Sequence, residues 1–155
     1  MGKNSDTTVQ QINFSLFMLS FAFLIFTFII TVRPVLLDNI VISLQVVLSI
    51  PFLTASVLGR LKLLKSGENT WDRFAYVYWI LGYVSLINAV GLLLGYLVSM
   101  VSAAIFFTGN IIVALSYSWF GIAETNASFA SRLRKDAFFI ALLLLFGILP
   151  LLGAY

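Results

Sequence analysis

The sequence contains no cysteine and no histidine, and only 10% of its 155 residues are charged. Without cysteine and histidine there is no disulfide, no thiol nucleophile and no zinc or haem held by thiolate or imidazole ligands. A serine–histidine dyad is excluded for the same reason. No set of acids, bases or metal ligands converges elsewhere in the sequence. We therefore expect no metal, no cofactor and no enzymatic activity.

The sequence is rich in apolar residues instead: 61% of it is hydrophobic. Ordinary soluble domains are about 45–50% apolar and about 25% charged. A soluble fold of this length has no interior large enough for so much apolar surface, because small domains leave much of their area in water. In a bilayer, lipid itself is the solvent for apolar faces. The composition predicts an all-α integral membrane protein.

Long apolar runs divide the sequence into a compact bundle of about five transmembrane helices. The runs are continuously apolar rather than alternating, which disfavours the strands of a membrane barrel. A helix needs about 20 apolar residues to cross a bilayer, and only the last run is marginal in length. The short break at Ser99-Met100 predicts a tight helical hairpin. The expected spans are residues 12–32, 35–58, 74–98, 101–122 and 137–154, behind a polar N-terminal tail of residues 1–11, so that 12–155 form one transmembrane domain.

Basic residues are distributed unevenly between the two sides of this predicted topology. Eight of the nine Lys and Arg residues fall in the tail or in the second and fourth connections, and only Arg33 falls on the opposite side. An excess of Lys and Arg marks the cytoplasmic side. We expect a cytoplasmic N-terminus, an outer C-terminus and contact of these basic segments with anionic lipid headgroups or a partner protein. The basic loop residues are Arg60, Lys62, Lys65, Arg73, Arg132, Arg134 and Lys135.

Polar side chains within the spans are the first candidates for a functional site, because they are costly in lipid. Counted along the spans, Gln45, Ser49, Asn88 and Asn110 all fall near the membrane midplane. They form either a polar binding site or pathway, or a set of interhelical hydrogen bonds; we favour the second interpretation because polar residues often serve as packing contacts. Two further stripes have helical spacing: Asp38, Gln45, Ser49, Ser56 and Gly59 in the second span, and Asn13, Ser20, Thr27 and Thr31 in the first.

Small residues in the third span predict close helix packing. Gly91 and Gly95 form a Gly-x-x-x-Gly pattern, which lets two helix backbones approach each other. Gly82 and Ser85 continue the same stripe: the packing residues are Gly82, Ser85, Gly91 and Gly95. At the outer boundary, Arg33 and Asp38 are spaced so that an interfacial ion pair across the Pro34 turn is expected.

Two functions are compatible with these patterns. In the first, the protein is a non-enzymatic structural or interaction subunit of a membrane complex, in a prokaryotic inner membrane, with its basic loops meeting a partner or anionic lipid. The alternative is a small homo-oligomeric channel or carrier lined by the midplane Gln, Asn and Ser residues. In both, the partners are lipid and protein, either further copies of the chain or another protein. The basic residues beside hydrophobic segments serve topology, so nucleic acid is not an expected partner.

Overall fold

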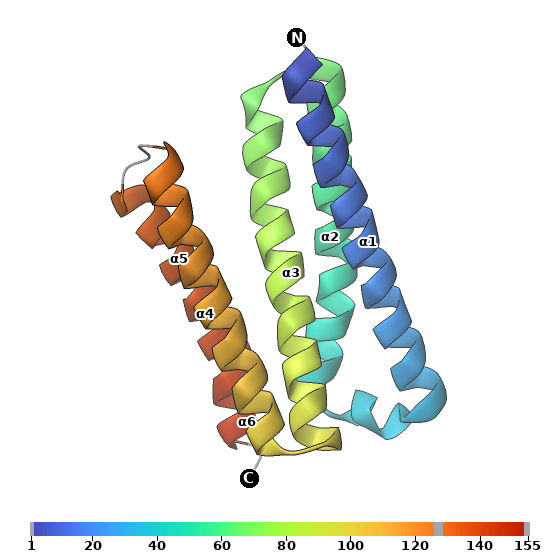
Figure 1. Cartoon of the computed structure of the whole chain (residues 1–155). Helices are drawn as coiled ribbons and strands as arrows, with labels where there is room; N and C mark the ends of the chain where they lie inside the picture. Colours follow the sequence, from blue (N-terminus) through green and yellow to red (C-terminus); the bar gives the residue numbers. More distant parts are fainter. Residues whose placement is uncertain (1, 126–128, 154–155) are drawn as a thin grey trace. The chain divides into compact units, whose positions relative to one another are not determined.

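The computed structural model describes residues 2–125 and 129–153, and within them the side chains of residues 6–116, 119 and 135–153. These residues are helical almost throughout and contain no strand (Figure 1). The elements are α1 (Gly2–Val32), the 3₁₀ turn η1 (Pro34–Asp38), α2 (Ile40–Ser66), α3 (Asn69–Leu97), α4 (Met100–Thr125), α5 (Phe129–Leu143), the π-helical turn η2 (Leu144–Ile148) and α6 (Leu149–Gly153).

Among the described residues, four helical stretches are long and apolar enough to cross a membrane: Asp6–Val32, Ile40–Ser66, Asn69–Leu97 and Lys135–Gly153. The all-helical class predicted from composition is therefore confirmed, and these four stretches are consistent with a membrane protein. A shorter apolar stretch, Met100–Ser116, belongs to α4. Helix is the expected backbone in lipid, because it satisfies every backbone polar group within its own segment.

The helix ends differ from the predicted boundaries in several places, of which the starts of α1 and α2 are two. The polar tail expected at residues 1–11 is largely helical, since α1 already begins at Gly2. The second helix begins at Ile40 instead of residue 35, because Pro34 opens the turn η1 and the chain is extended at Asn39. The Asn39 side chain then caps α2 by accepting hydrogen bonds from the N–H groups of Val41 (3.1 Å) and Ile42 (3.2 Å), as N-cap residues do.

The other end of α2 lies well beyond the predicted span. The helix continues through the basic stretch to Ser66, as its amphipathic pattern predicts, and stops at Gly67. Gly67 has a φ of 70°, a left-handed conformation that glycine adopts without a steric penalty. Its N–H donates to the Leu63 carbonyl at 2.8 Å, the usual glycine stop of a helix.

The chain divides into two compact units at residue 86, within α3. In the first unit, residues 1–86, α1 packs along α2 (Figure 1). Glycines bring α2 and α3 together: a Cβ on Gly82 would lie 2.9 Å from the backbone nitrogen of Leu53, and one on Gly59 would lie 3.3 Å from the Cα of Ala75. Since 82 pairs with 53 and 59 with 75, the two helices run antiparallel.

In the second unit, residues 87–155, the ring of Phe107 fills the space between helices. Phe107 is fully buried. A Cβ added to Gly91 of α3 would collide with its ring atoms. A Cβ added to Gly147 of η2 would lie 2.7 Å from the same ring. Gly95 faces Leu151 of α6 and, at 3.5 Å, Ala103 of α4. These pairs place the end of α3 antiparallel to α4, joined by the turn at Val98-Ser99, and so agree with the predicted hairpin.

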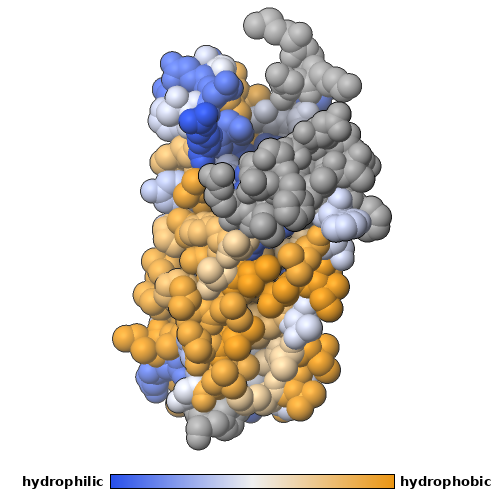
Figure 2. Space-filling model, turned by 90° about the vertical axis from the view of Figure 1, so that its left-hand side faces the viewer, coloured by the Kyte–Doolittle hydropathy of each residue, from blue (hydrophilic) through white to orange (hydrophobic). Residues whose placement is uncertain are grey.

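The outer surface has the character expected of a protein that lipid surrounds. The face drawn in Figure 2 is mostly hydrophobic, and its most hydrophilic residues gather at the ends. Along α1, large apolar side chains face outward, among them Phe17 at 65% exposure and Leu24 at 64%. Exposed apolar patches of this extent are rare on soluble monomers.

We predict that Gly91→Ile and Gly147→Ile lower the stability of the folded protein by about 1–3 kcal/mol, the usual cost of overpacking. Both side chains would collide with the Phe107 ring, which is held on two sides. Gly95→Ile should cost less, because it meets the flexible end of Leu151. Thermal unfolding in detergent, followed by circular dichroism, measures the effect.

The matched control is Gly109→Ile, because Gly109 lies on α4 with nothing within 4 Å of the site of a Cβ. Equal unfolding temperatures for the Gly91, Gly147 and Gly109 variants would contradict the close packing around Phe107.

Candidate functional site

The polar stripe of α2 is largely buried. Gln45 is 4% exposed, and Ser49 and Ser56 are fully buried, whereas Asp38 at the start of the stripe is exposed. Ser49 Oγ donates to the Val46 carbonyl at 2.7 Å, so this hydroxyl is satisfied within its own helix. Gln45 makes no hydrogen bond to the described part of the chain, and Ser56 Oγ is buried without a partner there. The inward face of α2 therefore holds polar groups that its own helix does not satisfy.

Asn88 on α3 is the one predicted midplane residue that joins two helices in the described structure. It is fully buried, and its Nδ2 donates to the Leu142 carbonyl of α5 over a long 3.4 Å. Its Oδ1 has no hydrogen-bond partner among the described residues. That oxygen lies against Gly147, at the place a Cβ would take, a position suited to a weak Cα–H···O contact between helices. The packing interpretation of Asn88 therefore has direct structural support.

The π-helical turn that receives Asn88 was not predicted from the sequence. In η2 the Leu149 N–H bonds the Leu144 carbonyl five residues back, instead of four. Pro150 follows at once and has no N–H to continue the regular pattern. Inserted polar side chains and prolines are the usual causes of such distortions. The pair Gly147 and Pro150 is the only signal in the sequence for this irregularity.

Asn110 does not join Asn88 in a common polar centre. Its Nδ2 donates to the Phe106 carbonyl of its own helix at 2.9 Å, and the residue is only half-buried. Gln45 belongs to the first unit, whereas Asn88 and Asn110 belong to the second. Ser85, at 8% exposure, is buried on α3. Asn88 and Asn110 were counted at the same depth along their spans, but they do not form a hydrogen bond with each other in the second unit.

The polar stripe of α1 faces outward instead of into the bundle. Asn13, Ser20, Thr27 and Thr31 are all exposed, while Ser15, Ala22 and Ile29 are fully buried on the opposite side of the helix. Ser20 and Thr31 donate to carbonyls of their own helix at 3.0 and 2.8 Å. Asn13 makes no hydrogen bond to the described residues. The amide of Asn13 is therefore presented to the surroundings of the helix.

The basic residues near the junction of α2 and α3 lie in the two helices and include one buried charge. Arg60 is only 7% exposed, and its Nε is buried without a hydrogen-bond partner among the described residues. Lys62, Lys65 and Arg73 are exposed. Lys62 Nζ lies 5.9 Å from the centre of the Trp71 ring, within the range of a cation–π interaction.

The predicted pair of Arg33 and Asp38 does not form. Both residues are exposed, and no ion pair joins them in the part of the chain that the structure describes. The turn η1 separates them, and an exposed pair of this kind contributes little stability in any case. The side chains of Arg132 and Arg134 lie outside the described residues, although their backbone belongs to α5, and Lys135 is exposed on the same helix.

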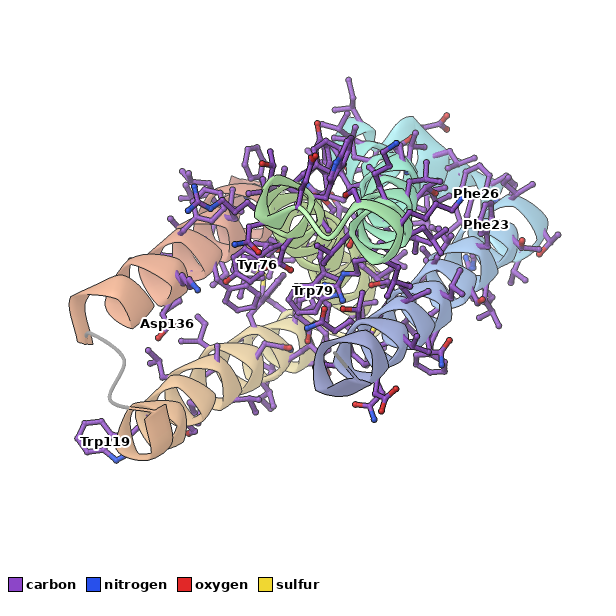
Figure 3. The ribbon with its side chains drawn as sticks, turned by 90° about the horizontal axis from the view of Figure 1, so that it is seen from above. Phe23, Phe26, Tyr76, Trp79, Trp119 and Asp136 are labelled. Carbon is purple, nitrogen blue, oxygen red and sulfur yellow. The ribbon has the colours of Figure 1, made fainter. Side chains whose placement is uncertain are left out.

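Aromatic rings mark the helix ends and the contact of α1 with α3. Seen from above, Trp119 projects away from α4 (Figure 3), and it is 71% exposed. Trp79, labelled in the same view, packs against Phe14 of α1 with ring centroids 6.3 Å apart and stacks on Tyr83 at 5.1 Å. Its Nε1 is buried without a partner among the described residues.

We predict that Asn88→Leu destabilises the protein by about 1–3 kcal/mol, because it removes an interhelical hydrogen bond and crowds Gly147. Asn110→Leu is the matched control: it removes only a bond within one helix, and its stability should change by less than about 0.5 kcal/mol. Equilibrium unfolding of both variants in mixed micelles compares them. An equal loss in the two variants would contradict the role assigned to Asn88.

Comparison of the chain with protein-family models, with curated proteins and with solved structures gives no match. The function is therefore argued from the residues described above.

Proposed function

We propose that this chain is a non-enzymatic structural subunit of a membrane complex, which associates with another transmembrane helix through the outward face of α1. The observation that carries the proposal is the exposure of Asn13, without a hydrogen bond to the described residues, on a helix of which only 22% of the most apolar window is buried. Phe17, Ser20, Leu24 and Thr27 continue that face at helical spacing.

The physical reason lies in the cost of an unsatisfied amide in lipid. A carboxamide facing hydrocarbon loses its hydrogen bonds to water, and a second helix that bonds it recovers about 0.6–2 kcal/mol. Small hydroxyl residues at Ser20 and Thr27 let that helix come close, while Phe17 and Leu24 supply contact area.

The five-span topology fits the packing of the second unit. Phe107 of α4 is held between Gly91 of α3 and Gly147 of η2, and these belong to two stretches that are long enough to cross a membrane. A helix packed at that level between two spans lies in the same layer of lipid. We therefore propose that α4 also crosses, which gives five spans with a cytoplasmic N-terminus, an outer C-terminus, and basic connections that face anionic headgroups in an inner membrane.

One observation favours the second candidate, a small homo-oligomeric channel or carrier. Gln45 is buried on α2 without a hydrogen bond to the described residues, and the hydroxyl of Ser56, buried without a partner among them, lies about three turns further along the same helix face. Buried polar groups without partners are the usual lining of solvated pathways in membranes. The packed environment of Asn88 is the reason that this candidate stands second.

We predict that a photoreactive amino acid at Leu24 cross-links a different protein in the native membrane. Leu24 is 64% exposed on the proposed face, and Val47 on α2, 47% exposed, is the control position. Mass spectrometry of the adducts identifies the captured chain. Capture of the same protein at Leu24 but not at Val47 supports the proposal, and substitution of Asn13 by Leu should weaken it. Adducts of this chain alone would favour the channel, and lipid adducts alone would contradict both.

We further predict that a reporter fused after Tyr155 is active outside the cytoplasm. An odd number of crossings places the two termini on opposite sides of the membrane, and eight of nine basic residues fix the N-terminus inside. Paired fusions of alkaline phosphatase and a fluorescent protein report the two sides. A purely cytoplasmic signal at Tyr155 would mean an even number of crossings and would remove α4 or the last helix from the membrane.

A further inference from the structure

We propose that Arg60 forms a specific site for the phosphate of an anionic lipid headgroup, at the end of the first unit where α2 and α3 are connected. The inference rests on the proposed contact of the basic segments with anionic lipid, and it names the side chain that makes the contact selective.

Arg60 is a buried cation without a hydrogen-bond or ion-pair partner among the described residues. A guanidinium carries five N–H donors and a permanent charge. Here the residue is 7% exposed, its Nε is buried without a hydrogen-bond partner, and the side chain makes neither a hydrogen bond nor an ion pair with the described residues. Burying an unpaired charge is among the most costly events in folding. A buried group in this condition calls for an external anion.

Among the described residues, no carboxylate forms an ion pair with Arg60 and so supplies that anion. Asp72, in the first turn of α3, attracts Arg60 electrostatically but forms no ion pair with it in the described structure, and Asp72 itself is exposed. Glu68 is also exposed. Counting the segment from Arg60 to Arg73 gives four basic residues against two acidic ones, a net charge of 4 − 2 = +2. The segment therefore remains attractive to an anion.

A phosphate matches the donors that Arg60 presents. The planar guanidinium bonds phosphate oxygens through two parallel N–H groups, which a single Lys does not do. Lys62, held 5.9 Å from the Trp71 ring, places a second cation at the same end of α2. Arg60 is expected to carry selectivity because it is the buried member, while the exposed lysines add only non-specific attraction.

The surroundings point to a lipid phosphate instead of a free one. Three large apolar side chains near the basic residues are exposed: Leu61 at 42%, Leu64 at 40% and Phe74 at 37%. A ring atom of Phe74 lies 2.8 Å from the position that a Cβ on Gly59 would take, and Gly59 directly precedes Arg60. A membrane lipid offers acyl chains for this apolar surface and a phosphate for the guanidinium. Trp71, which lies half-buried in the first turn of α3, is a residue type enriched at the level of headgroups.

The test measures lipid binding by native mass spectrometry of the full chain in detergent, with phosphatidylglycerol and phosphatidylcholine added in turn. The wild type should bind one phosphatidylglycerol at least about fivefold more tightly than phosphatidylcholine. Arg60→Gln should lose this preference. Lys65→Gln, which removes the same charge from an exposed residue of the last turn of α2, should keep it. Arg60→Lys should retain only part of it, because the planar fork is lost.

Three outcomes would overturn the inference: a wild type without preference between the lipids, an Arg60→Gln variant that keeps the preference, or an equal loss in Arg60→Gln and Lys65→Gln. If Arg60→Gln fails to fold, the wild type still decides. Phosphatidylglycerol should raise its unfolding temperature, whereas equal protection by inorganic phosphate would assign the site to a free anion. Cross-linking at Leu24 in the Lys65→Gln and Arg60→Lys variants reports separately on the association of α1.

Discussion

Because lipid is as apolar as a leucine side chain, no hydrophobic force draws the helices of this chain together, and their packing has to come from close contact. Glycine provides that contact in both units. At Gly59 and Gly82, the backbones of α2 and α3 come so close that a Cβ would lie within 3.3 Å of a backbone atom of the other helix. Gly91 and Gly147 make room for the ring of Phe107. A single methyl group at any of these four positions would have to displace a neighbour. The remainder of each unit, including the positions of its polar side chains, follows from these contacts.

Polar residues in the spans divide into those that their own helix satisfies and those that it does not. Ser15, Ser20, Thr31 and Thr54 donate to carbonyls four residues earlier, and Asn110 does the same with its amide. Such residues cost little in lipid and carry no information about function. The informative residues are those left over: Asn13, Gln45, Asn88 and Arg60. Each has an amide or guanidinium group that makes no hydrogen bond within its own helix among the described residues.

The sequence predicted the helical class, the hairpin at Ser99 and a helix in each of the five apolar runs, because these depend on local apolar length and on breaks in it. It did not predict the start of α2, since the apolar residues between Pro34 and Ile40 look like helix until Asn39 caps the chain. The α-helical start at Gly2 was missed because polarity was taken to mean irregular structure. Both errors come from judging a boundary by hydropathy alone, when capping groups decide it.

The candidate site was harder to predict than the fold for a different reason. Counting along spans gives depth but not direction, and direction decides whether an amide meets another helix or lipid. Asn88 and Asn110 have similar depths, yet one bonds the carbonyl of Leu142 and the other bonds its own helix. The sequence did not show that Gly147 makes room for the Phe107 ring. Phe107 is 40 residues away, and nothing in the sequence distinguishes it from other apolar residues. Only a packed structure reveals such a pair.

The same packing bears on the choice between a subunit and a carrier. Transport by rocking or gating requires helices that can exchange one arrangement for another, and closely interdigitated contacts resist gradual change. In the second unit, sliding α4 along its neighbours would force the Phe107 ring out of the space between Gly91 and Gly147. A rigid unit of this kind suits a structural role better than a mechanism that needs α4 to move.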